Sequence, residues 1–255
     1  MDDHSEPCEP AERVSAGGVG RAHAPTAGRE ATRQRIAVVI TAELTAVWAV
    51  GFIVLAVAVA SSPQAPAWDR SLLSALEAVR TPTLTAVFQA VTVAGEGWTV
   101  SALTIVAIAA VLLRGKRAYA TQFAVTMSAG WLVEYLVKNL FHRGRLPASE
   151  ALIIPPTSYS FPSGHAFVSL VLCALLVYVG FRLVRSCATR SALTAAALVL
   201  VLMVGVSRVY LGVHWPSDVL ASWFLAAAWL SLCLGGFTVW RWRRPGTREA
   251  EHTAA

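Results

Sequence analysis

A run of 25 residues from Ile36 to Ala60 contains a single charged side chain, Glu43. A helix rises about 1.5 Å per residue, so a run of this length can span the ~30 Å hydrocarbon core of a bilayer. Arg33 and Arg35 before the run, and small residues at its end, also resemble a signal peptide. The apolar region of a signal peptide is only about 7–15 residues long, however. We therefore predict an uncleaved membrane anchor, with a cleaved signal peptide as the alternative.

Five further apolar segments follow, and the composition favours the same environment for all of them. Hydrophobic residues make up 56% of the 255 residues and charged residues 14%, against about 45–50% and about 25% in soluble domains. This argues against a soluble globular enzyme and equally against a disordered chain. We predict an all-α fold, an integral membrane bundle of six transmembrane helices. The expected spans are Ile36–Ala60, Trp98–Leu113, Ala118–Val137, Ala166–Phe181, Ser191–Val206 and Val219–Trp240.

The interval 61–97 between the first two spans predicts a short amphipathic helix at the membrane interface. Asp69 is its expected N-cap and Thr81–Pro82 its expected stop. The segment Leu84–Val93 is apolar enough to enter the membrane further, and Gly95–Gly97 separates it from the next span. A plain connecting loop is the alternative. The expected apolar face consists of Leu72, Leu73, Leu76 and Val79.

The distribution of basic residues predicts which way the spans cross. Six spans divide the loops and tails into two sets, which hold 15 and 6 of the 21 Lys and Arg residues. The positive-inside rule places the larger set, with both termini, in the cytoplasm. We thus expect a disordered cytoplasmic tail over residues 1–35, a membrane domain over 36–240 and a basic cytoplasmic tail over 241–255. Topology explains the net charge of +6, and no nucleic-acid partner is expected.

Four of the six outside cations gather at the ends of spans, on the side where cations should be few. Two histidines, His165 and His214, fall in the same outer segments. Attraction to lipid headgroups would explain one isolated arginine, and an interfacial hydrogen bond would explain one isolated histidine. Neither explains the whole set. The four cations are Lys138, Arg143, Arg145 and Arg208.

The chemistry that this set suits is phosphoryl transfer. Fixed cations and the free N–H groups of a helix that begins at Pro162–Gly164 can hold phosphate oxygens. A neutral imidazole can attack phosphorus, Asp218 can hold the other ring nitrogen, and a second histidine can protonate the leaving group. His165, His214 and Asp218 could instead bind a metal ion. A divalent cation would be repelled by the four cations, so we expect no metal site.

The segments that carry these residues resemble the motifs of the type 2 phosphatidic acid phosphatase family, KxxxxxxRP, PSGH and SRxxxxxHxxxD. Pro162–His165 reproduces the second motif and Ser207–Asp218 the third. In the first motif, Lys138 and Arg145 have the family spacing, but Leu146 stands where the family has proline. Because proline restricts the backbone on both sides of it, Arg145 could be aimed differently here.

The resemblance covers about residues 36–240 and implies roles for individual residues. It makes His214 the nucleophile that becomes phosphorylated, Asp218 its support and His165 the acid toward the leaving group. Arg143 lies in the variable part of the first motif and is taken as a further binding residue. Glu134, four residues before Lys138, is expected to pair with that lysine. The implied phosphate-binding residues are Lys138, Arg145, Ser163, Gly164 and Arg208.

We therefore expect a membrane phosphatase without a metal or other cofactor, acting through a phosphohistidine at the outer face of a bacterial cell membrane. The implied substrates are phosphatidic acid, phosphatidylglycerol phosphate or an isoprenyl diphosphate. Vanadium-dependent haloperoxidases, which are related to this family, are soluble and so disfavoured by the hydropathy. One alternative is a weakly active or inactive protein that binds lipid phosphates. Another is a transporter, which would place ionisable residues near the bilayer midplane.

Overall fold

A computed structural model describes residues 24–61 and 65–243 of the chain. The chain divides into two compact units, residues 1–36 and 37–255. The described part of the first unit is the beginning of a helix. We expected a disordered tail over residues 1–35. Residues 1–23 of it lie outside the described residues, and residues 24–35 are helical. From residue 244 on, the expected C-terminal tail also lies outside them.

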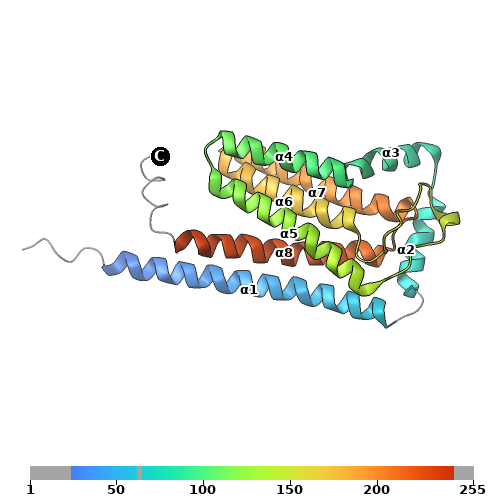
Figure 1. Cartoon of the computed structure of the whole chain (residues 1–255), viewed down its shortest axis with the longest axis horizontal. Coiled ribbons are helices and arrows are strands. Elements are labelled where there is room, and N and C mark those ends of the chain that lie inside the picture. The colour runs from blue at the N-terminus through green and yellow to red at the C-terminus, as the bar shows by residue number, and fades with distance from the viewer. Residues whose placement is uncertain (1–23, 62–64, 244–255) are drawn as a thin grey trace, which may run out of the picture. The chain divides into compact units, whose positions relative to one another are not determined.

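All regular structure in the described residues is helical (Figure 1). Most helices are long, and two short 3₁₀ turns, η1 and η2, interrupt the connections. The elements are α1 (Ala24–Ala60), α2 (Ala67–Ala78), α3 (Pro82–Thr92), η1 (Val93–Gly95), α4 (Gly97–Leu113), α5 (Arg117–Phe141), η2 (Ala148–Glu150), α6 (Gly164–Leu183), α7 (Cys187–Tyr210) and α8 (Pro216–Trp242).

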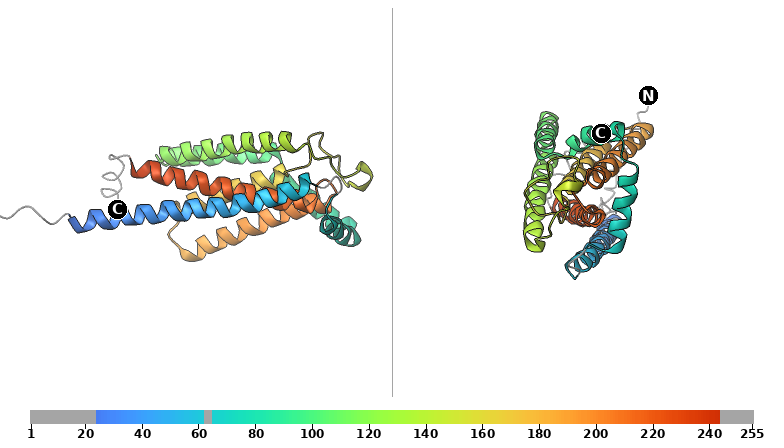
Figure 2. Two further views of the ribbon diagram at one scale, coloured as in Figure 1. Left: turned by 90° about the horizontal axis from the view of Figure 1, so that it is seen from below. Right: turned by 90° about the vertical axis from the view of Figure 1, so that its right-hand side faces the viewer.

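Helix α6 is the centre of the second unit, because it contacts α4, α5, α7 and α8. Figure 1 shows these helices running side by side, with α2 and α3 at the end where α6 begins, and Figure 2 gives two further views of the same arrangement. Phe167, Val171 and Leu175 of α6 are buried against Phe123 of α5 and Leu230 of α8. The first half of α6 is thereby held firmly against α5 and α8.

The six expected spans coincide with α1, α4, α5, α6, α7 and α8. These helices differ in whether their length and hydropathy allow them to cross a membrane. Among the described helices, α1, α6, α7 and α8 are each long and apolar enough. Helices α3 and α4 meet that test as a pair, bent by 49° at the expected break at Gly95–Gly97. Helix α5 does not meet it, and it carries Arg117, Glu134 and Lys138. That α5 crosses the membrane remains a prediction.

Helix α2 follows the first span as expected and ends at Ala78, before the expected stop at Thr81–Pro82, but the expected N-cap was wrong. Asp69 is not the N-cap: the helix begins at Ala67, and the Asp69 side chain is fully buried in its first turn. Thr81 also caps α3 by accepting a hydrogen bond from the Leu84 N–H at 3.2 Å. The apolar face is also split. Leu73 and Leu76 pack against the bundle, whereas Leu72 and Val79 are exposed.

Gly212, in the turn between α7 and α8, offers a test of this packing. Its φ is +70°, and a Cβ there would collide with the carbonyl oxygen of Glu150. A non-glycine residue in such a conformation costs about 1–3 kcal/mol, so we predict that Gly212→Ala lowers the melting temperature in detergent. Gly236→Ala is the control. Gly236 lies within α8, and a Cβ added there would have no atom within 4 Å. The free energy of unfolding of this variant should therefore rise by about 0.5–1 kcal/mol. Equal melting temperatures for the two variants would contradict the geometry of the turn.

Candidate active site

His214 and Asp218 form a buried pair where α8 begins. His214 Nδ1 lies 3.3 Å from Asp218 Oδ2, and the two residues are 2% and 0% exposed. The spacing of four residues brings them together because the chain turns at Trp215 and enters α8 at Pro216. With its proton on Nδ1, the ring donates to the carboxylate. Its other nitrogen, Nε2, is then left with a free electron pair.

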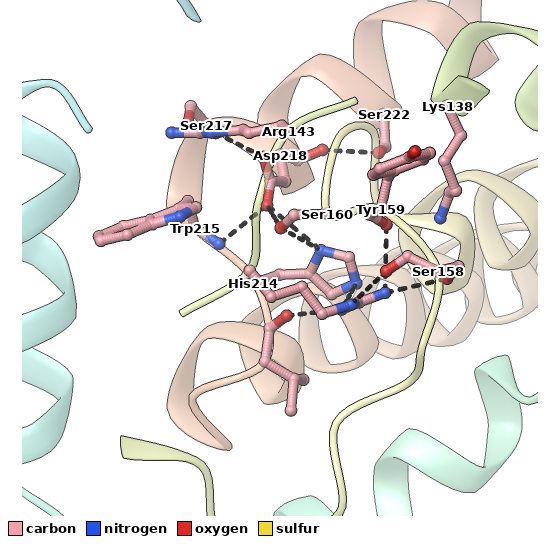
Figure 3. Close-up of polar contacts among 12 residues, drawn as sticks. Lys138, Arg143, Ser158, Tyr159, Ser160, His214, Trp215, Ser217, Asp218 and Ser222 are labelled. Atoms are coloured by element: carbon pink, nitrogen blue, oxygen red, sulfur yellow. Dashed lines mark hydrogen bonds and ion pairs between the residues drawn. The ribbon is translucent and has the colours of Figure 1, made fainter. Parts of the chain in front are cut away.

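Asp218 accepts hydrogen bonds from three further groups (Figure 3). Arg143 Nη1 lies 2.5 Å from Oδ1, and the Ser160 hydroxyl donates to Oδ2. The backbone N–H of Trp215 donates to Oδ2 at 3.0 Å. An ionised carboxylate with several donors is stabilised in its charged form. The carboxylate is therefore fixed in both position and charge.

Arg143, which the sequence suggested as a further phosphate-binding residue, has charged partners within the protein. Its guanidinium bridges two buried carboxylates, Asp218 at 2.5 Å and Asp69 of α2 at 3.1 Å. It also donates to Ser217 Oγ at 2.7 Å and lies over the ring of Trp215. Its charge is thus matched by carboxylates within the protein, and the geometry makes it a support for Asp218.

Asp69 is the residue that completes this support. Its carboxylate accepts from the Ser217 backbone N–H at 2.7 Å and from the Ser217 hydroxyl at 2.5 Å, besides the ion pair with Arg143. Both donors of Ser217 belong to the first turn of α8, whose N–H groups lack partners inside the helix. Helix α2 therefore anchors the start of α8.

Arg145 reaches the free side of His214. Its Nη1 lies 3.2 Å from His214 Nε2 and donates to the Val213 carbonyl at 2.7 Å. Its other nitrogens donate to Ser158 and to the Tyr159 carbonyl. All these partners are neutral, so the guanidinium charge is left for a ligand. Leu146, in place of the family proline, is buried in an apolar cluster, and Arg145 still reaches the histidine.

Lys138 lies at the end of α5, beside the start of α6. Its Nζ is 2.8 Å from Glu134 Oε1, which confirms the expected pair. Gly164 lies against this pair: a Cβ at that position would be 3.0 Å from Glu134 Oε1. Glycine thus lets the N-terminus of α6 come close to the lysine.

His165 and Arg208 make contacts with the segment that precedes α4. His165 Nε2 lies 3.2 Å from Glu96 Oε1 without forming a directed hydrogen bond. Arg208 Nη1 donates to Thr92 Oγ1 at 2.7 Å, and its Nε has no partner. The buried hydroxyl of Ser163, at the N-cap of α6, has no partner either. These unfilled donors surround one region, because His165 is near enough to His214, Lys138, Arg145 and Arg208 for electrostatic interaction.

Burial sets the protonation state of His214. It lowers the pKa of the ring from its ordinary value of 6.5 to about 3, and the nearby Arg145 and Arg208 act in the same direction. The hydrogen bond and the charge of Asp218 oppose this shift. Burial also lowers the pKa of the Arg145 guanidinium, although Asp218 and Glu134 counteract the effect. An arginine stays charged in proteins, so a neutral imidazole faces a cation at pH 7.

Metal binding finds no support in the donor set. Within residues 24–61 and 65–243, no group of three or more His, Cys, Asp or Glu side chains is arranged to hold a metal ion. The groups nearest His214 Nε2 are positively charged. The arrangement suits an anion.

Comparison with known proteins agrees with the motifs. The family model described as PAP2 superfamily matches residues 118–242, so this segment belongs to the PAP2 superfamily. An undecaprenyl-diphosphatase of Sulfolobus acidocaldarius is 29% identical over 109 residues, 43% of this chain and 48% of the relative. Phosphatidylglycerophosphatase B of Bacillus subtilis is 26% identical over 175 residues, 68% of this chain and 85% of the relative. The chain thus spans about half the length of the first relative and most of the second.

Two solved structures share the fold. A transmembrane PAP2-type phosphatidylglycerolphosphate phosphatase from Bacillus subtilis superposes with a TM-score of 0.67, at 24% identity. The match covers 77% of this chain and 96% of that one. LpxE of Aquifex aeolicus gives a TM-score of 0.51 at 20% identity, over 67% of this chain and 98% of that one. The helical membrane fold is therefore that of PAP2 phosphatases.

Three polar residues of this site precede the family segment and were not assigned to it from the sequence. Glu96 had a signal, since it is a lone charge between two glycines in an apolar region. Asp69 was interpreted as a helix cap, because an acidic residue near a helix start is typical of one. Thr92 had no signal. The structure brings all of them to the motif residues through α2, α3 and η1.

The role of Asp69 can be measured through stability. Asp69→Ala leaves the Ser217 N–H without a partner and removes one carboxylate from Arg143, and breaking a buried ion pair typically costs about 3–5 kcal/mol. We predict a clear fall in melting temperature in detergent. Asp69→Asn keeps an acceptor for the Ser217 N–H, so its melting temperature should fall less.

Glu77→Ala is the matched control on the same helix. Glu77 forms a partly exposed ion pair with Arg80 at 3.4 Å, and such pairs contribute about 0–1 kcal/mol. Its melting temperature should stay near that of the unaltered protein. If Asp69→Ala were no less stable than Glu77→Ala, the anchoring role of Asp69 would be refuted.

Proposed function

We propose that this protein is a metal-independent phosphatase that hydrolyses a lipid phosphate or diphosphate in the membrane through a phosphohistidine intermediate. The observation that carries the proposal is the position of His214 Nε2. The ring is neutral, is held from behind by Asp218 and faces the Arg145 guanidinium at 3.2 Å. A nucleophile beside a fixed cation is what attack on a phosphoryl group requires.

In the first step, the electron pair of His214 Nε2 forms a bond to phosphorus while the bond from phosphorus to the lipid oxygen breaks. His165 donates a proton to that oxygen, so the lipid leaves as an alcohol, or as a lipid monophosphate from a diphosphate. The Nδ1 proton stays on His214, where Asp218 balances the charge of the phosphorylated ring. The position of His165 within electrostatic range of His214, Lys138, Arg145 and Arg208 supports this assignment.

In the second step, His165 accepts a proton from water as the oxygen attacks phosphorus and the bond between phosphorus and nitrogen breaks. Inorganic phosphate leaves, His214 regains its free electron pair, and His165 is again protonated. The same residue thus serves as acid and then as base, which is how a single group can support both halves of such a reaction.

The phosphate would be held by the cations whose charge is not already matched. Arg143 faces two carboxylates and Lys138 faces one, whereas Arg145 and Arg208 donate to neutral groups. Arg208 Nε and Ser163 Oγ have no partners of their own and could bind phosphate oxygens. Lys138 and the backbone beside Gly164 lie at the same helix start and complete the binding set.

The substrate class is proposed from the relatives. One is named for undecaprenyl diphosphate and the others for phosphatidylglycerol phosphate, and both are lipids with a terminal phosphate. Phosphatidic acid shares that feature. A panel of these three lipids in detergent, with phosphate release as the readout, would identify the preferred one.

The two histidines should respond differently to the leaving group. His214→Ala should abolish turnover and any acid-labile phosphoenzyme, because the nucleophile is gone. In His165→Ala, the rate of phosphate release should fall about 10²–10⁴-fold when the leaving group is a lipid alkoxide, which is the usual contribution of an acid catalyst. The rate should fall much less with nitrophenyl phosphate, whose leaving group needs little protonation. Rates of phosphate release and trapping of the phosphoenzyme measure both effects.

Several results would decide against this mechanism. Equal losses of His165→Ala on both substrates would remove its acid role, and phosphate trapped on His165 would exchange the two assignments. Loss of activity in excess chelator, restored by a divalent ion, would overturn metal independence. Tight lipid-phosphate binding without any release of phosphate would favour the binding protein instead.

The orientation of the site can be tested with thiol labelling in intact cells. We propose that it faces outward, with the start of α7 in the cytoplasm, on the basis of the loop charges. Cys187 at that start is exposed and serves as a native reporter. An impermeant reagent should not label the unaltered protein until the cells are permeabilised, whereas Ala148→Cys, near the active site, should be labelled at once. The reverse pattern would place the site in the cytoplasm.

A further inference from the structure

A second group of basic side chains lies at the end of the bundle opposite His214. There α4 ends, α5 begins and α6 ends (Figure 1), and the three helix ends enclose a pocket of about 250 Å³. A water molecule occupies about 30 Å³ in the liquid, so the pocket has room for a polar group of several atoms. Arg114, Lys116 and Arg182 line it, together with Tyr119.

The aromatic side chains beside the pocket position its cations. The Arg182 guanidinium lies over the rings of Tyr178 and Tyr119, at 5.4 and 6.0 Å from their centroids. Arg241, from the last turn of α8, donates to the Tyr119 hydroxyl at 2.5 Å. That hydroxyl keeps its own proton for a ligand. Cations held against aromatic faces lose less freedom when they bind an anion.

The three cations that line the pocket have no carboxylate within ion-pair distance in the part of the chain that the structure describes. None of its ion pairs there involves Arg114, Lys116 or Arg182. Helix α5 begins in the pocket without a side-chain cap or an acidic residue in its first turn, so its free N–H groups and positive dipole end add to the field. The pocket thus has an excess of positive charge and hydrogen-bond donors.

Apolar side chains on the same rim indicate what kind of anion would fit. Val111, Val179 and Leu183 line the pocket, and Leu113, next to Arg114, is 89% exposed. An apolar surface directly beside a cationic pocket matches a molecule with a phosphate at one end and hydrocarbon at the other. A soluble anion would gain nothing from that surface.

We propose that this pocket, lined by Arg114, Lys116, Tyr119 and Arg182, binds the phosphate headgroup of an anionic phospholipid. Basic pockets between transmembrane helices bind such headgroups in other membrane proteins. The site is separate from the candidate active site and does not depend on catalysis. The bound lipid would join the ends of α4, α5 and α6 at the predicted cytoplasmic surface.

The test uses the full chain in phosphatidylcholine nanodiscs that contain increasing amounts of phosphatidylglycerol. Native mass spectrometry counts the phosphatidylglycerol molecules retained by the protein. The variant R114Q/R182Q removes two charges from the pocket. The control R117Q/R185Q removes two charges from the same two loops, at residues that do not line it. We expect at least tenfold weaker retention for the pocket variant than for the control, because bonds to charged groups contribute more than general surface attraction.

Equal weakening in both variants would overturn the proposal, since general attraction to the positive surface would then suffice. Absence of retained phosphatidylglycerol in the unaltered protein would overturn it as well. Calorimetry with inorganic phosphate distinguishes the source of the anion. Binding of free phosphate that R114Q/R182Q abolishes would assign the pocket to a soluble anion instead. Matching melting temperatures of both variants would establish that the exposed substitutions leave the fold intact.

Discussion

Asp218 has no exposure to solvent, and an ionised carboxylate in that position costs several kcal/mol unless other groups compensate it. The compensation comes from four groups in different parts of the loops: His214, Arg143, Ser160 and the adjacent Trp215 backbone N–H. Removing any one of these donors leaves the charge less satisfied, so the loops that carry them are held in one arrangement. This requirement orders the polar end of the bundle, while apolar packing against α5 and α8 holds the body of α6.

The charges at this end form two groups with different tasks. Lys138 and Arg143 are matched by Glu134, Asp69 and Asp218, and such pairs hold the framework in place. Arg145 and Arg208 donate to carbonyls and hydroxyls, which satisfy hydrogen bonds but not charge. Arg208 is buried and Arg145 is partly buried, so water screens their charges less than at an open surface, and the two guanidinium groups attract an anion more strongly. Arginine suits this task since it cannot lose its proton.

The sequence was informative where its signals were local. Apolar runs predicted the helices, and the spacing within Ser207–Asp218 predicted the His214–Asp218 pair, because residues four apart at a helix start can meet. Local signals say nothing about which distant segment supplies a partner. Asp69 reaches Ser217 across 148 residues and Thr92 reaches Arg208 across 116, and no spacing rule connects them. The carboxylate partners of Arg143 were not predicted for the same reason: Asp69 and Asp218 belong to other elements.

The contacts of Asp69, Thr92 and Glu96 have a consequence for the borders of the unit that forms the candidate active site. The PAP2 family segment begins at residue 118, yet partners of Arg143, Arg208 and His165 lie between residues 69 and 96. A chain cut back to residues 118–242 would keep every motif. Arg143, Arg208 and His165 would each lose one partner. The unit that evolution can exchange between proteins, or that an engineer can transplant, therefore begins no later than α2. Similarity of the motif segment alone underestimates it by about 50 residues, the distance from Asp69 to residue 118.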